Sequence, residues 1–510
     1  MLSGENNIAV VIMDGILGYL KATDYLPELE GRIVLVKSDL NVPFISGDDQ
    51  PPRVADPFRI LQAAPFIREL INAGIIPLLV THLGRPKGYN PSLTLDPIIG
   101  HLSGAIEKNV EIIRFDPERV MFNSRQFNPD YIRGLFKDGV IPILDNIRFH
   151  TDETKNRDTL ARALVSVVNL SIQNSFGTAH RKETTSNRIH EYIPGLAGSL
   201  LVDEIESHAK TKRPGSPYVV IVGGDKVEDS LQLMRAIFRA EKTTHWSNMF
   251  NPELNLQIGE RLVDYVLVGG HLMYAFVYAQ LTMLKEENLR GLPGDVKKDL
   301  RGLREVKLKG YDSSEGGGYQ YDTEEINLAQ GLLRLYNNFQ FRDTNPLEGR
   351  RLIVPVDYAV KRGDTIFRSV QLNELLDDDE IVDFGDRTKD LYASVVDTAK
   401  TIVWNGPLGV DDERYTEGTR RLIDSIHANK EAVKEIGGGS TNFMTSAYEK
   451  ESGRKFNMGF RSTGGGSTLL ETAYDSPVTI SLIMSARKLL EGGYGIPYET
   501  LRKAVIRRQL

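Results

Sequence analysis

A glycine pair and a lysine follow an apolar run near the middle of the chain. The run Val219–Val222 is mostly β-branched, and Gly223, Gly224, Asp225 and Lys226 come directly after it. This pattern predicts a buried strand, a tight turn and the start of a helix. Backbone N–H groups at such a turn can hold a phosphate group together with a lysine. The segment is not a Walker A loop, because the motif G-x-x-x-x-G-K-[ST] is absent. The alternative is therefore a glycine turn with a surface lysine.

Cationic and polar side chains follow four apolar runs in the first half of the chain. These runs predict strands at Ile33–Val36, Ile75–Val80, Val140–Leu144 and Leu164–Ile172. Because the carboxyl ends of parallel strands line one crevice, the residues that follow these strands can converge. Those with cationic or imidazole side chains are His82, Arg85, Arg148, His180 and Arg181. They predict a site for a small, highly anionic molecule, unless each arginine has its own surface ion pair.

Three further glycine-rich turns lie in the second half, next to predicted strands or helices. They are Gly269-Gly270-His271, Gly437-Gly438-Gly439-Ser440-Thr441 and Thr463-Gly464-Gly465-Gly466-Ser467. Turns of this kind expose backbone N–H groups, which suits a nucleotide. The run Gly316–Gly318 lies among Ser, Glu and Tyr between charged segments, and it predicts a surface loop.

Strands alternate with helices in both halves, which predicts an α/β fold of two doubly wound domains with mostly parallel sheets. Helices are predicted over Arg53–Ala73 and Leu200–Lys210, and a break at Thr211–Pro217 marks the domain boundary. A basic, amphipathic surface helix is predicted at Pro497–Leu510. In the second half, the predicted strands are Val219–Val222, Asp264–Val268, Leu352–Val356, Ile381–Phe384 and Thr401–Trp404.

The composition narrows the range of functions. The chain has 510 residues, a net charge of −7 and no cysteine. The negative charge argues against a general nucleic-acid binder, and the lack of cysteine excludes disulfides, thiol catalysis and cysteine-bound metal. No apolar run is long enough to span a membrane, and the first residues have no basic leader. We expect a cytoplasmic protein.

Seven motifs in a fixed order give the chain a resemblance to the phosphoglycerate kinase family, from about Glu28 to Glu471. They are D-L-N-V-P at Asp39, H-L-G-R-P at His82, D-N-I-R-F-H at Asp145, F-G-T-A-H-R at Phe176, G-G-D-K-V at Gly223, V-W-N-G-P-L-G-V at Val403 and S-T-G-G-G at Ser462. The resemblance implies a 3-phosphoglycerate-binding domain at 1–205 and a nucleotide-binding domain at 206–475, with an insertion near 292–325. It also implies a hinge helix, domain closure, and a C-terminal extension at 476–510 that packs back on the first half.

The resemblance also implies a reaction and its residues. A monomer would transfer a phosphoryl group reversibly between 1,3-bisphosphoglycerate and magnesium ADP, as in glycolysis. Arg59, Lys226, Gly465 and Gly466 would be catalytic. Substrate would contact Asp39, Leu40, Asn41, Arg59, His82, Leu83, Gly84, Arg85, Arg148, His180 and Arg181. The nucleotide would contact Gly223, Gly224, Asp225, Lys226, Gly269, Asn405, Pro407, Asp412, Gly438, Gly439, Ser440 and Thr441.

Several positions depart from the family's motifs. On the substrate side, Lys37 replaces an arginine, Asn174 an aspartate and Glu183 a histidine. On the nucleotide side, Ser230 replaces a lysine, His271 a glycine and Asp412 a glutamate. Ser440 replaces the aspartate that binds the nucleotide's magnesium, and Asp225, beside Lys226, is a candidate to replace that ligand. Two hypotheses therefore remain: a working kinase with a remodelled nucleotide site, or a non-catalytic paralogue that binds sugar phosphate or nucleotide.

Overall fold

The computed structural model describes most of the chain, and it divides into two compact units. The described residues are 18–47, 50–211, 215–224, 227–237, 263–287, 323–336, 351–377, 379–410, 417–473 and 480–509. Of these, the first unit contains residues 18–206 and 480–509, and the second contains 207–473. Most of the predicted insertion near 292–325, and the predicted loop at Gly316–Gly318, lie outside the described residues.

The first unit is built on a parallel six-stranded sheet with the order β10-β9-β1-β4-β8-β5. Its strands are β1 (Ile33–Lys37), β4 (Ile76–Val80), β5 (Asn109–Ile113), β8 (Val140–Leu144), β9 (Leu170–Gln173) and β10 (Gly195–Ala197). Every residue of the central strands β1 and β4 is buried, and Leu35 lies opposite Leu78. Strands that are buried on both faces need apolar residues on both, which explains the apolar sequence of β4 and that of β1 as far as Lys37.

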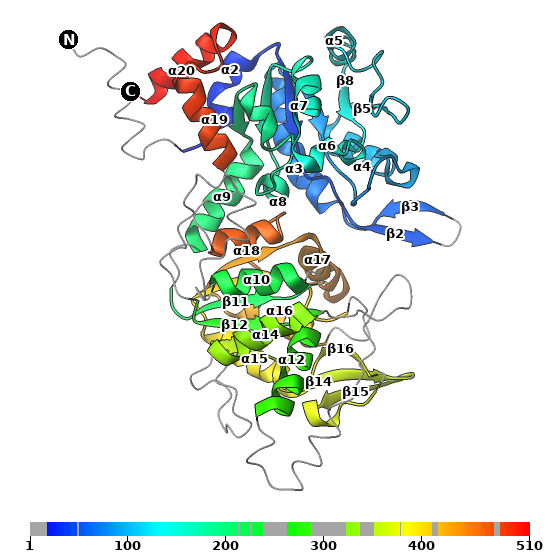
Figure 1. Ribbon diagram of the computed structural model, residues 1–510, viewed down its shortest axis with the longest axis vertical. Coiled ribbons are helices and arrows are strands. Elements are labelled where there is room, and N and C mark those ends of the chain that lie inside the picture. The colour runs from blue at the N-terminus through cyan, green and yellow to red at the C-terminus, as the bar shows by residue number, and fades with distance from the viewer. Residues whose placement is uncertain are drawn as a thin grey trace, which may run out of the picture. The chain divides into compact units, whose positions relative to one another are not determined.

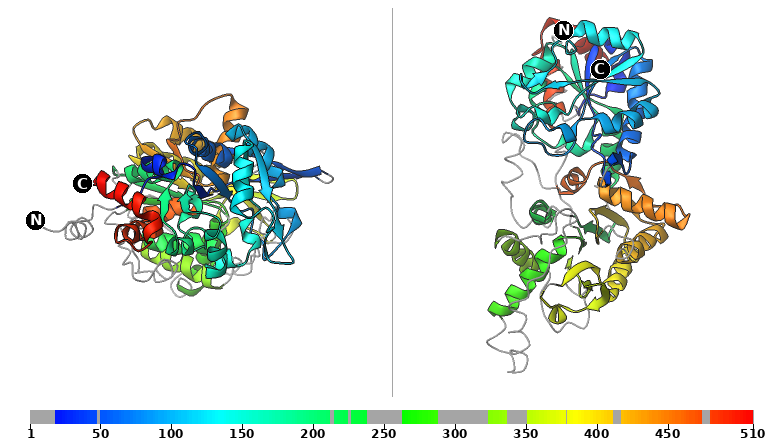
Figure 2. Two further views of the ribbon diagram at one scale, coloured as in Figure 1. Left: turned by 90° about the horizontal axis from the view of Figure 1, so that it is seen from above. Right: turned by 90° about the vertical axis from the view of Figure 1, so that its right-hand side faces the viewer.

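Helices cover both faces of this sheet (Figure 1, and Figure 2, right). Val34 and Val36 of β1 share one hydrophobic cluster with residues of α3 (Phe58–Asn72) and α4 (Asp96–Ile106). Ile33 and Leu35 point to the other face, where they join a cluster that includes residues of α5 (Pro129–Lys137) and α7 (Asp158–Val165). Adjacent side chains of a strand alternate between faces, so one short strand serves both layers.

The C-terminal residues belong to the first unit. Helices α19 (Ile480–Leu490) and α20 (Glu499–Gln509) place Leu489, Leu501 and Val505 in the same cluster as Val34. Ser485 Oγ accepts a hydrogen bond of 2.8 Å from the backbone N–H of Gly195, so α19 is also attached to the edge strand β10. The buried residues of α20 recur at helical spacing, while Lys503 and Arg507 are exposed.

The second unit has its own parallel six-stranded sheet, in the order β13-β12-β11-β17-β18-β19. Its strands are β11 (Tyr218–Val222), β12 (Tyr265–Val268), β13 (Leu352–Ile353), β17 (Thr401–Asn405), β18 (Val433–Gly437) and β19 (Phe460–Arg461). Its helices include α10 (Val227–Ile237), α12 (Leu272–Glu287), α14 (Thr323–Tyr336), α15 (Asp386–Thr398), α16 (Glu417–Ala428), α17 (Gly439–Ser452) and α18 (Gly466–Ala473). The predicted fold of two doubly wound, mostly parallel domains is confirmed.

Helix α9 (Ser199–Thr211) contains the boundary between the units, because Glu206 belongs to the first and Ser207 to the second. The helix predicted at Leu200–Lys210 is confirmed within one residue at each end. None of the helices in the described ranges has the length and apolar character that crossing a membrane requires.

Four predictions about elements were wrong in part. The strand predicted at Leu352–Val356 is only the two-residue strand β13. The strand predicted at Leu164–Ile172 begins only at Leu170, because α7 continues to Val165. The helix predicted from Arg53 begins at Phe58, and Arg53 belongs to β3 (Gln50–Val54), which pairs with β2 (Phe44–Gly47). The strand predicted at Ile381–Phe384 exists as β16 (Glu380–Phe384), but it pairs antiparallel with β14 (Tyr358–Arg362) in a separate small sheet. An apolar run predicts a buried strand without specifying its partner.

Candidate functional site

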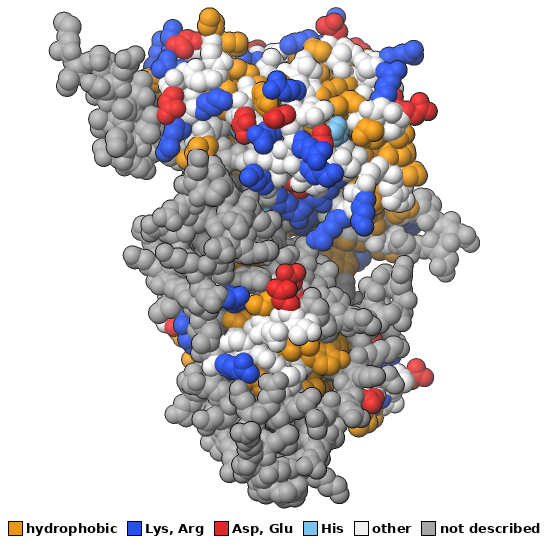
Figure 3. Space-filling view, in the orientation of Figure 1, with side chains coloured by type: hydrophobic (Ala, Val, Ile, Leu, Met, Phe, Trp, Pro, Cys, Tyr) orange, Lys and Arg blue, Asp and Glu red, His pale blue; other side chains and the backbone are white. Residues whose placement is uncertain are grey.

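The predicted anion-binding residues come together at the carboxyl edge of the first sheet. Asp39 follows β1 and His82 follows β4, while Arg148 lies in the 3₁₀ turn after β8 and Arg181 follows the short helix after β9. Because β9, β1, β4 and β8 are neighbours and parallel, the loops after them share one edge. In Figure 3, Lys and Arg side chains gather on the lower part of the first unit.

Asp39, Asn41 and Arg59 form one side of this cluster. Arg59 Nη1 lies 3.2 Å from Asp39 Oδ2 and donates a hydrogen bond of 2.7 Å to the backbone carbonyl of Asn41. Asn41 Oδ1 accepts from the backbone N–H of Gly84 at 3.1 Å, which joins the loops after β1 and β4. Burial raises the pKa of Asp39, but the charge of Arg59 and smaller contributions from neighbouring groups together outweigh burial, so this pKa lies below its usual value.

Arg148 and Arg181 form the other side. Arg148 Nη1 donates to the backbone carbonyl of Gly84 at 2.8 Å, and Nη2 donates to Glu183 Oε1 at the same distance. Arg181 Nη1 lies 3.7 Å from the same carboxylate oxygen. The Nε atoms of Arg59 and Arg148 are buried without a hydrogen-bond partner among the described residues. Buried donors of this kind are costly unless a ligand or water accepts from them.

His82 lies within this cluster as a neutral side chain. Burial lowers its pKa to about 3, although the charge of Asp39 acts in the opposite direction. A neutral imidazole can donate one hydrogen bond without adding charge, whereas each arginine donates hydrogen bonds and also adds a positive charge. His82 therefore suits a role in orientation rather than in charge neutralisation.

The other predicted substrate contacts lie in the same loops. Leu40 and Leu83 are buried, and their side chains belong to the hydrophobic cluster that contains Val34. The backbone N–H of Leu40 donates to Thr81 Oγ1 at 3.0 Å. Arg85 is exposed, and His180 is half-buried at the end of helix α8 (Phe176–Ala179).

Asn146 is a positioning residue that the sequence did not single out. Its Nδ2 donates to the backbone carbonyls of Leu83 at 2.7 Å and Leu93 at 3.0 Å, and its Oδ1 accepts from the backbone N–H of Arg148. Asn146 thus fixes the turn that carries Arg148 against the loop after β4. Its place inside D-N-I-R-F-H was the only available indication.

Glycine-rich turns meet at the carboxyl edge of the second sheet. The backbone N–H of Gly224, after β11, donates to the carbonyl of Pro407, after β17, at 2.8 Å. Gly270, after β12, donates to the carbonyl of Leu408 at 2.6 Å. A Cβ on Gly223 would overlap the carbonyl oxygen of Pro407, so only glycine allows this approach.

The turns after β17, β18 and β19 are joined in the same way. Thr441 Oγ1 accepts from the backbone N–H of Gly406 at 2.9 Å. A Cβ built on either Gly438 or Gly465 would lie within 3.2 Å of Asn405 Oδ1, and Gly438 has φ +91°. Asn442 Nδ2 donates to the carbonyls of Gly438 and Ser462, which ties two of the turns together; the sequence did not indicate this residue. Helices α17 and α18 begin at these turns, so their N-terminal N–H groups face the same edge.

Three predicted nucleotide residues, Asp225, Lys226 and Asp412, lie outside the described residues. Gly269 lies directly after β12, and Gly439 and Ser440 open α17. Ser440 is exposed, while Ser230, where a lysine was expected, is buried. Within the described part of the chain, no three His, Asp or Glu side chains gather in a way that would hold a metal ion. Mg²⁺ prefers carboxylate and phosphate oxygens, so the neutral hydroxyl of Ser440 fits this ion poorly.

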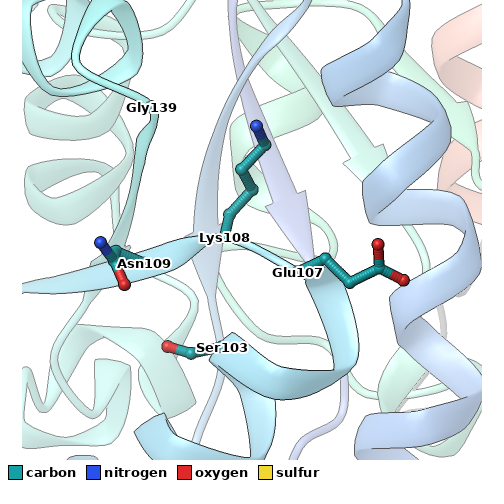
Figure 4. Close-up of a pocket in the computed structure, with 5 residues that line it drawn as sticks. All are labelled: Ser103, Glu107, Lys108, Asn109 and Gly139. Atoms are coloured by element: carbon teal, nitrogen blue, oxygen red, sulfur yellow. The ribbon is translucent and has the colours of Figure 1, made fainter.

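A hollow elsewhere on the first unit does not belong to the site. It is lined by Ser103, Glu107, Lys108, Asn109 and Gly139 (Figure 4). Asn109 begins β5 and Gly139 directly precedes β8, so the hollow lies at the amino edge of the sheet. The anion-binding cluster lies at the carboxyl edge, where ligands of open parallel sheets bind.

Comparisons with known proteins agree with this architecture. A family model described as phosphoglycerate kinase matches residues 23–245 and 256–472. Proteins named phosphoglycerate kinase from Dictyoglomus turgidum and Thermosipho africanus are each 29% identical to this chain, over 451 and 453 residues. Each alignment covers 87% of this chain, and 93% and 92% of the respective relatives.

Solved structures agree as well. The crystal structure of phosphoglycerate kinase from Pyrococcus horikoshii OT3 is 25% identical, covers 92% of this chain and all of its own, and has a TM-score of 0.65. The structure of phosphoglycerate kinase from Coxiella burnetii, at 22% identity and a TM-score of 0.58, has the same fold. With a family model that matches most of its length, this chain belongs to the phosphoglycerate kinase family.

Proposed function

We propose that this protein transfers a phosphoryl group reversibly between 1,3-bisphosphoglycerate and magnesium ADP, yielding 3-phosphoglycerate and ATP. Family membership supports this reaction class. The observation that carries the proposal is the cluster of Arg59, Arg148 and Arg181 at one sheet edge, with two buried guanidinium Nε atoms that lack partners among the described residues. A small molecule with several negative charges would supply acceptors for these donors.

The first unit would hold the glycerate. Arg148, Arg181 and the exposed Arg85 would bind its phosphate, and the neutral His82 would donate a hydrogen bond. Asp39 and Asn41 would accept and donate hydrogen bonds at the hydroxyl end. Arg59, held by Asp39 and the carbonyl of Asn41, would stabilise charge that develops on the transferring phosphoryl group. No protein nucleophile is required, because phosphoryl transfer depends on positioning and on electrostatic stabilisation.

The second unit would hold the nucleotide. Its glycine turns offer backbone N–H groups at the carboxyl edge of the sheet, where helices α10, α12, α17 and α18 begin. Magnesium enters as part of the nucleotide substrate. Lys226 would contact the transferring phosphoryl group, and Gly465 and Gly466 would lie beside it. We further propose a cytoplasmic, monomeric enzyme of glycolysis.

The test is a coupled assay that follows ATP formation from 1,3-bisphosphoglycerate and magnesium ADP. We expect turnover by the wild-type protein and a large loss in Arg59→Ala. The exposed, neutral Ser440 favours a second candidate, a paralogue that binds ligands without transferring phosphate. Calorimetric binding of 3-phosphoglycerate without any turnover would establish that second function and overturn the first.

A further inference from the structure

Glu183 places a carboxylate directly on the cations of the predicted anion site. Its Oε1 accepts from Arg148 Nη2 at 2.8 Å and lies 3.7 Å from Arg181 Nη1. Its Oε2 accepts from Lys37 Nζ at 2.8 Å. One carboxylate thus contacts both arginines that would bind the phosphate of the substrate, and a lysine behind them.

The charge of Glu183 is secured by its surroundings. The side chain is 7% exposed. Burial raises the pKa of a carboxyl group, but the charges of Lys37, Arg148 and Arg181 outweigh that effect and hold the pKa of Glu183 far below its usual value. Glu183 is therefore an anion at every pH at which the protein would work.

Lys37 gives this anion a partner that is independent of the arginines. Besides Glu183, Lys37 Nζ donates to Glu153 Oε1 at 3.1 Å and to Ser186 Oγ at 2.7 Å. Glu153 in turn accepts from the side chain and the backbone N–H of Thr185. Glu183 can therefore release Arg148 and Arg181 to an incoming anion while its other oxygen stays bound to a fixed ammonium group.

We propose that Glu183 is an internal anion that competes with the phosphate group of the ligand for Arg148 and Arg181. It keeps the two guanidinium groups in place when the ligand is absent and lowers the affinity of the site when the ligand arrives. Glu183 is thus a specificity-determining residue, since its repulsion acts most strongly on ligands of high negative charge. This inference rests on the proposed function of the same site.

The test compares Glu183→Gln with the wild-type protein, using inorganic phosphate and 3-phosphoglycerate as calorimetric probes. Glutamine keeps the size of the side chain and one acceptor oxygen but removes the charge. Two like unit charges about 4 Å apart repel each other near a protein surface, and counter-ions and rearrangement remove a large part of this repulsion. We therefore expect both probes to bind about five- to tenfold more tightly. Unchanged or weaker binding would overturn the proposal.

Glu153→Gln is the matched control. It alters the second carboxyl group that contacts Lys37, and the side-chain hydrogen bonds of Glu153 go to Lys37 and Thr185 rather than to Arg148 or Arg181. We expect it to change phosphate affinity by less than about twofold, since only the longer-range part of the charge acts. An equal gain in phosphate affinity in both variants would mean that net charge alone matters. It would overturn the proposal that Glu183 competes with the ligand for the arginines.

The outcomes also separate this inference from the proposed function. A wild-type protein that binds neither phosphate nor 3-phosphoglycerate contradicts the proposed substrate site itself. A wild type that binds both, with no gain in Glu183→Gln, contradicts only the role of Glu183. If Glu183→Gln does not fold by circular dichroism, Glu183→Asp takes its place. That variant keeps the negative charge but moves it away from the arginines. We expect both probes to bind about two- to threefold more tightly, and unchanged affinity would overturn the proposal.

Discussion

Lys37 Nζ lies 2.8 Å from Glu183 Oε2, and both side chains are almost completely buried. Lys37 ends β1, and Glu183 follows the loop after β9, so the pair connects neighbouring strands of the first sheet. These are two of the positions at which the chain departs from the family's motifs. Their contact joins the two departures: Lys37 keeps the positive charge of the arginine that it replaces, and Glu183 places a buried anion against it in place of a histidine.

Loss of Lys37 should destabilise the first unit strongly. In Lys37→Met, the carboxylates of Glu153 and Glu183 both lose the ammonium group that neutralises them. Removing one partner of a buried ion pair costs about 3–5 kcal/mol, and we expect a fall of this size in the free energy of unfolding, measured in urea.

Lys21→Met is the control for this prediction. Lys21 Nζ lies 2.6 Å from Glu206 Oε1, but these side chains are 41% and 58% exposed. A surface pair contributes about 0–1 kcal/mol. Equal destabilisation in the two variants would contradict the importance assigned to burial.

Arg148→Ala should weaken binding of 3-phosphoglycerate by about 1.5–3 kcal/mol, the value of a charge-assisted hydrogen bond. The variant removes the guanidinium group that links Gly84 to the predicted ligand site. Calorimetry measures the change. Arg68→Ala is the control, because Arg68 lies on α3 and donates to the carbonyl of Ala105. Unaltered binding in Arg148→Ala would place the ligand elsewhere.

Arg59→Ala should lower kcat by roughly a hundredfold, which is typical of losing one group that stabilises charge in the transition state. We expect the KM for the glycerate to change little, because the interaction strengthens only as phosphate is transferred. Steady-state kinetics separates the two parameters. A raised KM with normal kcat would assign Arg59 to holding Asp39 and the backbone of Asn41, which it contacts in the structure.

The central strands could be predicted from the sequence because their residues are apolar on both faces. This holds for β1, β4, β8, β11 and β17. Among the strands that were not predicted, β5 and β18 escaped prediction for opposite reasons. The amino end of the edge strand β5 is exposed, and β18 carries Lys434 and Glu435 in a buried position. The carboxylate of Glu435 contacts His208, whose Nδ1 lies 2.9 Å from Oε2. A partner so distant in the sequence can be identified only from the structure.

Residues of the candidate site could be predicted where a charged or polar residue comes soon after a strand. Arg148 and Arg181 were found because parallel strands bring the residues after them to one edge. Glu183 and Asn442 could not be assigned a role, because each acts through contacts with segments distant in the sequence or with carbonyl groups. Charge type and spacing do not indicate which cation a buried carboxylate will meet.

Stability should fall as the pH is lowered, partly because of His190. Burial, with the charge of Lys37, lowers its pKa to about 3, and its Nδ1 lies 2.6 Å from Ser481 Oγ of α19. In the unfolded chain a histidine has a pKa of about 6.5, so between these two values only the unfolded state takes up the proton. The free energy of unfolding therefore falls by up to about 1.4 kcal/mol for each pH unit below about 6.5, on account of this group alone.

His190→Asn should make this fall shallower. Urea denaturation of the wild type and the variant at several pH values between about 6.5 and 4.5 measures the difference in slope. His101→Asn, at an exposed position of α4, controls for the loss of a histidine as such. The same slope in the wild type and His190→Asn would show that His190 is protonated in the folded protein over this range.

The last prediction concerns the magnesium of the nucleotide. Ser440 opens α17 as an exposed, neutral side chain where the family's motif has an aspartate. Magnesium prefers one or two carboxylates together with phosphate and water. Ser440→Asp should therefore strengthen magnesium-dependent binding of ADP, measured by calorimetry with magnesium and with EDTA. Because Ser440 is exposed, we expect the variant to leave packing unchanged, since surface substitutions change stability by about 0.5 kcal/mol or less.

Asp225→Ala completes this experiment, although Asp225 lies outside the described residues. An aspartate next to Lys226 repels the phosphates of a nucleotide unless a cation lies between them. If Asp225 has taken over the role of the lost ligand, Asp225→Ala abolishes the magnesium dependence, and Ser440→Asp restores it in the double variant. If Asp225→Ala instead tightens ADP binding with or without magnesium, the aspartate is a repulsive group. The non-catalytic function would then be the better account of the nucleotide side.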